Sequence, residues 1–239
     1  MQHHFSVILE ETSHTGNIGA CARAMKTMGI SDLRLIKCVS HEQSDTYARA
    51  SGADDILFHA QTFSDLPCAI KDRHLIFGMS GRKRHNHKHC IEANQIPSII
   101  ANQSNHTNIG LLFGNEQNGL SNASISHCHY QVCIPTNPTF SSLNLASAVQ
   151  LICYICTTDT KPTTQICAKE TLTSHKQSEA LVSTILQLLK GSKYDNPQTL
   201  SQTTQRIRQL ILHSPFEETD IDLIIGLLKA IIRQSHNDK

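Results

Sequence analysis

Short apolar runs alternate with segments of helical spacing along the first two thirds of the chain. The runs at residues 6–9, 33–36, 56–58, 75–77, 109–113 and 131–134 are rich in Ile, Val, Leu and Phe, as buried parallel strands are. Helices are expected at residues 18–28, 45–50, 64–70, 91–102 and 143–156. The alternation predicts an α/β domain with a mainly parallel sheet, whose ligands bind at the carboxyl ends of the strands.

The pattern changes after residue 157. Residues 158–169 are rich in Thr and include a proline, and we interpret them as a linker. No strand pattern follows, and apolar residues recur at helical spacing in residues 170–189, 200–212 and 220–234. The sequence therefore predicts a first domain at residues 1–157, the linker at residues 158–169 and a small all-helical C-terminal domain at residues 170–239.

Composition narrows the class of protein. The 239 residues carry a formal net charge of +1, and 39% of them are hydrophobic. Because the chain has neither an apolar run of roughly 20 residues nor a signal-peptide pattern, we expect a soluble, cytoplasmic protein without a membrane span. The nine cysteines are an odd number and do not indicate a disulfide framework. Cys153 and Cys156 form a CxxC in a predicted helix, where packing is favoured over a redox role.

Metal binding is not expected. His85, His87, His89 and Cys90 form a tempting cluster, but no second CxxC or HxxxH completes a tetrahedral site. His127 and His129 precede a predicted strand and indicate a metal even less.

The first candidate segment, residues 12–23, connects a strand to a helix. Asn17 or Thr15 can cap this helix, and Arg23 follows about two turns later. One interpretation is a tight turn with a surface arginine. The other is an anion site in which Arg23 and the helix N-terminus hold a phosphate.

The second candidate segment, residues 111–122, follows a strand and is rich in glycine and asparagine. It matches neither GxGxxG nor a Walker GK[ST], which argues against a dinucleotide or nucleoside triphosphate site. It offers the backbone amide of Gly114 and the carboxylate of Glu116 to a polar ligand.

The third candidate segment, residues 134–150, begins with prolines and ends in an apolar helix. Pro135 and Pro138 prevent regular helix, and Ser141 or Ser142 can cap the helix that follows. Asn144 is polar at the start of that helix. It is either a buried amide that fixes the loop or a ligand contact.

In order and approximate spacing, these segments resemble the three signature motifs of the SpoU-type RNA 2′-O-ribose methyltransferases, which belong to the SPOUT superfamily. The resemblance covers about residues 5–156, and it is strongest to members that methylate cytidine or uridine at nucleotide 32 of the tRNA anticodon loop. It implies an α/β fold that ends in a deep trefoil knot. It also implies S-adenosylmethionine as methyl donor, S-adenosylhomocysteine as product, and a homodimer with sites at the subunit interface.

Carried over to this sequence, the resemblance places the cofactor in three loops. The residues that it assigns to cofactor binding are Met79, Ser80, Gly81, Gly114, Ile134, Ser141, Ser142 and Leu143.

The resemblance also assigns catalytic and supporting roles. Arg23 stands in the catalytic position, but a guanidinium with a pKa above about 12 is a poor base. We therefore expect Arg23 to anchor phosphate and to stabilise the developing alkoxide. Ser142 is expected to position substrate and cofactor, Asn17 to hold the loop of Arg23, and Glu116 and Asn144 to brace the knot.

RNA binding requires positive charge near the reaction centre. Arg82, Lys83 and Arg84 directly follow the cofactor loop, so phosphate contact is favoured over a merely solvated loop. Asn115 and Phe140 replace residues that are often Arg and Tyr in the family, which affects fine specificity rather than the reaction class.

Three alternatives to a tRNA enzyme remain at this stage. A ribosomal RNA 2′-O-methyltransferase would share every motif, and a non-catalytic RNA-binding protein could use the same scaffold. The missing GxGxxG argues against the third, a dehydrogenase.

Overall fold

A computed structural model describes residues 3–81, 89–137, 139–140, 142–158, 173–192, 194–214 and 216–237. Its described strands form one seven-stranded sheet in the order β3-β2-β1-β6-β4-β7-β5, and all their pairings are parallel. The strands are β1 (His4–Glu10), β2 (Asp32–Ile36), β3 (Gln61–Phe63), β4 (Leu75–Met79), β5 (Cys90–Glu92), β6 (Asn108–Phe113) and β7 (Tyr130–Cys133). The expectation of a mainly parallel α/β fold is confirmed.

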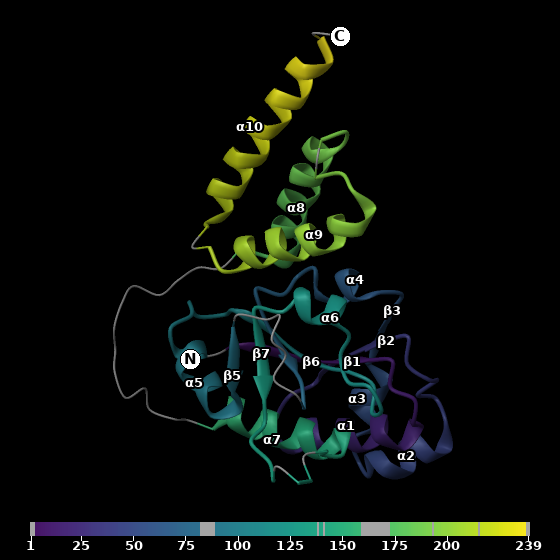
Figure 1. Cartoon of the computed structure of the whole chain (residues 1–239). Coiled ribbons are helices and arrows are strands. Elements are labelled where there is room, and N and C mark those ends of the chain that lie inside the picture. The colour runs from purple at the N-terminus through teal and green to yellow at the C-terminus, as the bar shows by residue number, and fades with distance from the viewer. Residues whose placement is uncertain are drawn as a thin grey trace.

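Helices cover both faces of the sheet. Figure 1 shows α1, α2, α3 and α7 on one side, and α4 and α6 on the side that faces α8 and α9. The helices of this part are α1 (Thr15–Thr27), α2 (Ser44–Ala50), α3 (Asp54–Phe58), α4 (Leu66–Ile70), the 3₁₀ turn η1 (Ala93–Gln95), α5 (Ile96–Ala101), α6 (Asn122–Ser126) and α7 (Leu145–Thr157).

Strand β1 shows why the sheet needs helices on both faces. Val7 and Leu9 are fully buried in the larger apolar cluster, which includes residues of α1 and α7. Ile8 points to the opposite face and is buried in a second cluster with residues of α4 and α6. Successive side chains of a strand alternate between faces, so a strand buried on both sides appears as a continuous apolar run.

The predicted strand at residues 56–58 is wrong. These residues end α3, which buries Ile56 and Leu57 and leaves Phe58 79% exposed. The strand in this region is β3, which lies at the sheet edge and has Phe63 as its one apolar residue. The other predicted strands correspond to β1, β2, β4, β6 and β7, while β5 and α6 were not expected.

The C-terminal residues form the helices α8 (His175–Leu189), α9 (Pro197–Leu212) and α10 (Glu218–Asn237). They have their own apolar cluster, in which Leu181, Val182 and Ile221 are buried. The predicted linker lies outside the described residues except for Thr158. In the described chain, no helix combines the length and the apolar character needed to cross a bilayer.

Hydrogen bonds hold the C-terminal helices against the sheet layer. The backbone N–H of His175 donates to the Arg73 carbonyl at 2.9 Å, and that of Lys176 donates to the Lys71 carbonyl at 3.1 Å. From α9, Gln209 Nε2 donates to the Ser126 carbonyl at 2.9 Å. The helical layer therefore rests on the α4 and α6 side of the sheet.

Candidate functional site

Side-chain hydrogen bonds join the three candidate segments. Asn17 Nδ2 donates to Glu116 Oε1 at 2.8 Å, and Asn144 Nδ2 donates to Asn17 Oδ1 at 3.3 Å. The other carboxylate oxygen of Glu116 accepts from the Ser13 backbone N–H at 3.1 Å and from the Ser13 hydroxyl at 3.0 Å. Asn17 therefore links the first segment to both of the others.

These contacts favour the ionised form of Glu116 and lower its pKa. Partial burial raises the pKa of its carboxyl, but the hydrogen bonds from Asn17 and Ser13 outweigh burial, so the net pKa lies below the ordinary value. An anionic carboxylate accepts stronger hydrogen bonds than a neutral group does. Glu116 is thus a structural acceptor that fixes one loop against another.

The N-cap residues of α1 and α7, the two helices beside the cavity, differ from those expected. Helix α1 starts at Thr15 after His14, and its N-cap makes no side-chain hydrogen bond, so the prediction that Thr15 or Asn17 caps it is wrong. Asn17 lies inside the first turn, where its amide reaches the other loops.

Helix α7 is capped by Asn144, not by Ser142, whereas Ser141 lies outside the described residues. Asn144 Oδ1 accepts from the Ala146 N–H at 2.9 Å. Since its Nδ2 also donates to Asn17, the exposed Asn144 amide fixes the loop without being buried.

A cavity of about 570 Å³ opens beside this network. It lies at the carboxyl ends of β6, β4 and β7, which are neighbours in the sheet. Its volume falls in the range of about 300–1,000 Å³ that small-molecule sites occupy. The lining residues are Met79, Ser80, Gly81, Phe113, Gly114, Asn115, Glu116, Gln117, Asn118, Gly119, Asn122, Ile134, Thr136, Ser142, Leu143, Leu145 and Ala148.

The lining includes every residue that the resemblance assigned to cofactor binding except Ser141, which is not described. Sequence reasoning missed several others: Phe113, Gln117, Asn118, Gly119, Asn122, Thr136, Leu145 and Ala148. All of these lie within the second and third candidate segments, so their position in those segments was the available signal.

Gly114 is required by a close approach of backbone to backbone. A Cβ at this position would lie 2.3 Å from the Leu120 nitrogen and 2.4 Å from the Gly119 carbonyl carbon. The Gly119 N–H donates to the Asn115 carbonyl at 2.8 Å, which folds the loop over Gly114. No side chain fits here unless the loop moves.

Arg23 lies outside the cavity lining. It is exposed on α1, and within the described residues its guanidinium has no hydrogen-bond or ion-pair partner. One turn later, the Thr27 hydroxyl donates to Gln150 of α7 at 3.2 Å, so Arg23 is on a part of α1 that borders α7. Arg82, Lys83 and Arg84 lie outside the described residues.

The CxxC of α7 is a packing feature. Cys153 is fully buried, and burial raises the pKa of its thiol to about 12. Because the thiolate is the reactive form, a thiol held protonated is a poor redox group.

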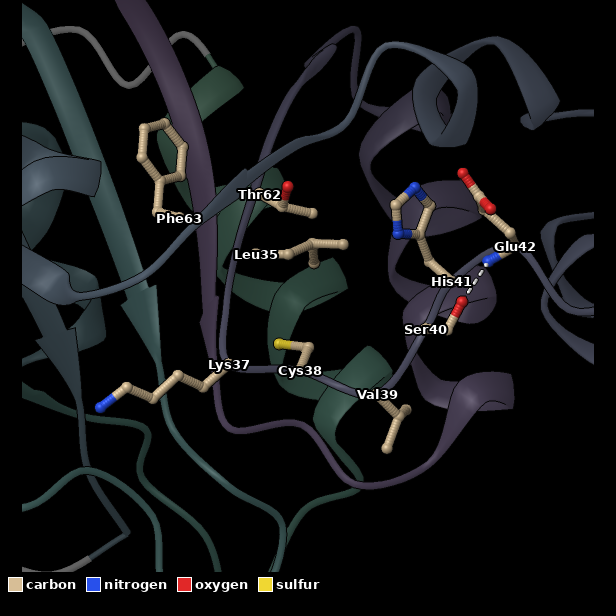
Figure 2. Close-up of a pocket in the computed structure, with 9 residues that line it drawn as sticks. All are labelled: Leu35, Lys37, Cys38, Val39, Ser40, His41, Glu42, Thr62 and Phe63. Carbon is tan, nitrogen blue, oxygen red and sulfur yellow. Dashed lines mark hydrogen bonds between the residues drawn. The ribbon is translucent and has the colours of Figure 1, made fainter.

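A second hollow of about 390 Å³ lies beyond the ends of β2 and β3. Figure 2 shows Leu35, Thr62 and Phe63 on one side and His41 and Glu42 on the other, with the Lys37 side chain extending away. None of the three candidate segments contributes to its lining. The larger cavity is therefore the candidate site.

The fold and the cavity define a parallel α/β protein that binds a small molecule through loops at the carboxyl ends of adjacent strands. The lining combines apolar side chains such as Phe113, Ile134 and Leu145 with polar loop residues, a composition typical of small-molecule sites. Residues 4–154 match the model of the SpoU rRNA Methylase family. The chain belongs to this family.

Relatives of the chain support this membership. The chain is 32% identical to tRNA (cytidine/uridine-2′-O-)-methyltransferase TrmJ of Pectobacterium atrosepticum, over 97% of this chain and 98% of the relative. The crystal structure of TrmJ from Z. mobilis ZM4 has a TM-score of 0.84 and 28% identity, covering 95% of this chain and 98% of its own.

A more distant structure shares the fold. It is the SpoU methyltransferase AviRb from Streptomyces viridochromogenes in complex with the cofactor AdoMet. Its TM-score is 0.52 at 23% identity, covering 66% of this chain and 58% of its own.

Proposed function

We propose that this protein transfers a methyl group from S-adenosylmethionine to the 2′-hydroxyl of a ribose in tRNA. The observation that carries the proposal is the cavity lined by the second and third signature segments, with Asn17 of the first segment joined to Glu116 and Asn144 by hydrogen bonds beside it. The TrmJ relatives, which match nearly the whole chain, support tRNA as the substrate class.

The residues of the cavity suit the cofactor. Gly114 leaves no space for a side chain, so its loop offers backbone atoms to a ligand. Met79 to Gly81, Gly114, Ile134, Ser142 and Leu143 line the cavity and hold the cofactor in this proposal, together with Ser141, which lies outside the described residues. The structure of AviRb, which shares the fold, was solved in complex with AdoMet. When bound, S-adenosylmethionine supplies the electrophilic methyl group and the leaving group.

The protein must align the ribose hydroxyl and handle its proton. Ser142 lines the cavity and positions the ribose against the cofactor. Arg23, which is exposed and has no partner among the described residues, binds RNA phosphate and stabilises the alkoxide as it develops. Arg82, Lys83 and Arg84 follow Gly81 directly in the sequence, and in this proposal they contact RNA phosphate.

A homodimer completes the site in this proposal. Exposed apolar side chains lie on or before α7, with Phe140 78% and Tyr154 54% exposed. Exposed aromatic side chains of this kind favour an interface. Pairing of two copies through α1 and α7 brings Arg23 to the subunit boundary. Sedimentation at several protein concentrations measures whether the chain forms this dimer.

A deep trefoil knot and a division into two domains also belong to the proposal. Strand β7 lies between β4 and β5, both of which precede it in the chain, as expected for a chain end threaded past an earlier loop. Domains at residues 1–157 and 170–239 are supported by the separate apolar cluster of the C-terminal helices.

The test is methyl transfer from labelled S-adenosylmethionine to tRNA transcripts, with fragments of ribosomal RNA as the competing substrate class. We expect label in tRNA, and mapping of 2′-O-methylated nucleotides should place it at C32 or U32 in a cytoplasmic tRNA pool. Label in ribosomal RNA alone would identify an rRNA enzyme. Binding of RNA without binding of S-adenosylmethionine would identify a non-catalytic RNA-binding protein.

A further inference from the structure

A cluster of two histidines and a glutamate lies where α8 meets the sheet layer, on the opposite side from α1 and α7. His127 is the C-cap residue of α6, while His175 and Glu179 are in the first two turns of α8. A spacing of four residues places His175 and Glu179 on one face of the helix. His175 is 1% exposed, the His127 side chain is 12% exposed and the Glu179 side chain is 25% exposed.

The three ligand-type atoms lie close to one another. His127 Nδ1 lies 3.2 Å from His175 Nε2, and Glu179 Oε1 lies 3.8 Å and 3.9 Å from these two nitrogens. A point equidistant from three atoms with these separations is about 2.1 Å from each, which is the usual distance from zinc to imidazole nitrogen or carboxylate oxygen. In the part of the chain that the structure describes, this is the group whose spacing suits a metal ion.

We propose that His127, His175 and Glu179 bind a zinc-type divalent ion that fastens α8 to the end of α6. Two imidazoles and one carboxylate form a donor set that suits zinc and neighbouring transition metals rather than Mg²⁺ or Ca²⁺. Water on the exposed side of Glu179 supplies the remaining position. The site differs from the expectation that the chain binds no metal.

Histidine binds a metal as the neutral imidazole, which has one lone pair per ring. His127 Nδ1 and His175 Nε2 lie within hydrogen-bond distance of each other, so without an ion one of these two nitrogens carries a hydrogen that points to the other. Binding requires both N–H groups to be on the ring nitrogens that face away from the ion, which is a change of tautomer without a change of charge.

Arg208 both orients and opposes the site. It donates from Nε to Glu179 Oε1, and from Nη2 to Glu179 Oε2 at 3.1 Å. Hydrogen bonds of this kind fix the direction of a ligating carboxylate. The positive charge weakens the binding of a cation, so we expect selectivity for a metal with strong affinity for imidazole.

Zinc titration of the untagged full chain, treated with EDTA and then freed of it, tests the proposal by calorimetry. We expect one zinc per chain, and His127→Gln should weaken binding by more than about 100-fold, beyond the loss that follows removal of a supporting group. His59→Gln is the control, because His59 is also the C-cap residue of a short helix but is exposed and lies outside the cluster. A double variant, His85→Gln with His87→Gln, removes the other histidine cluster and should leave the stoichiometry unchanged.

Failure of the wild-type chain to take up zinc would overturn the proposal, and so would an unchanged affinity in His127→Gln. If that variant does not fold, X-ray absorption of the zinc-loaded wild type decides. Two imidazole nitrogens in the coordination shell support the site, whereas sulfur ligands or a single imidazole contradict it. None of these measurements depends on methyl transfer.

Discussion

Asn17 donates to Glu116 across 2.8 Å, although 99 residues separate them in the chain. Asn17 stands in the first turn of α1 and Glu116 in the loop after β6, so this bond sets the position of the cavity wall relative to the helix that carries Arg23. The carboxylate has two oxygens, and both are in use.

Replacement of Glu116 by Gln should weaken cofactor binding. The amide offers one acceptor where the carboxylate offers two, so the bond to Ser13 or to Asn17 is lost. Loss of a charged hydrogen bond costs about 1.5–3 kcal/mol, and we expect the Kd for S-adenosylmethionine to rise about tenfold. Calorimetry measures the change. Glu42→Gln, exposed and outside the larger cavity, is the control, and equal affinities of the two variants would contradict the role of Glu116.

Gly114→Ala should abolish detectable cofactor binding while the chain remains folded. The new methyl group would collide with the backbone of Gly119 and Leu120, so the loop must open. Gly226→Ala is the matched control, because a Cβ at Gly226 meets nothing within 4 Å. Calorimetry measures affinity and circular dichroism checks folding. Normal affinity in Gly114→Ala would show that this loop is not part of the cofactor site.

Arg23→Ala should reduce methyl transfer by at least about 100-fold, as the loss of a group that stabilises developing negative charge does. Cofactor affinity should stay near the wild-type value, because Arg23 is outside the cavity lining. Single-turnover transfer to tRNA and calorimetry with S-adenosylmethionine separate the two effects. Arg49→Ala, an exposed arginine on α2, controls for lost surface charge. Near-normal transfer in Arg23→Ala would exclude the assigned role.

Stability in the presence of EDTA should fall as the pH decreases from about 6.5 towards 4. His127 and His175 have folded-state pKa values of about 4 and about 3, below the ordinary 6.5. In that interval the unfolded chain binds more protons than the folded chain, so the free energy of unfolding rises with pH and the histidine contribution is complete above about 6.5. Glu179 and Arg208 face the pair, and the rings titrate together.

Urea unfolding at a series of pH values measures this dependence. His127→Gln should flatten the slope between pH 4 and 6.5, values set by the folded and ordinary histidine pKa. His59→Gln should leave it unchanged. A slope that survives in His127→Gln would assign the pH dependence to other groups.

The central strands were predictable because both of their faces are buried. Ile8 of β1 and Leu112 of β6 are fully buried, and each belongs to a continuous apolar run that the sequence pattern reveals. Residues 56–58 look like such a run, yet Asp54 and Asp55 begin a helix there. The edge strands β3 and β5 are three residues long and none of their residues is fully buried, so neither forms an apolar run that the sequence pattern could reveal.

The site was predictable to a similar extent and for a related reason. Strands that run parallel bring their following loops to one edge, so the convergence of the three segments follows from the pattern. The hydrogen bond from Asn144 to Asn17 could not be predicted from this pattern, because it depends on the residue at which α7 begins. The pair of His127 and His175 was also hidden, since 48 residues separate them and only the packing of α8 on the sheet layer joins them.

The long separation of the bonded segments has a consequence during protein synthesis. Ser13 cannot bond to Glu116 until 103 further residues have been synthesised, and Asn17 cannot bond to Asn144 until 127 further residues have been synthesised. Contacts so distant in sequence form late, because closing long loops costs entropy before any contact compensates for it. A nascent chain that has not yet extended past α7 from the ribosome therefore has no complete cavity, and the ability to bind a ligand there marks chains whose sheet has finished folding.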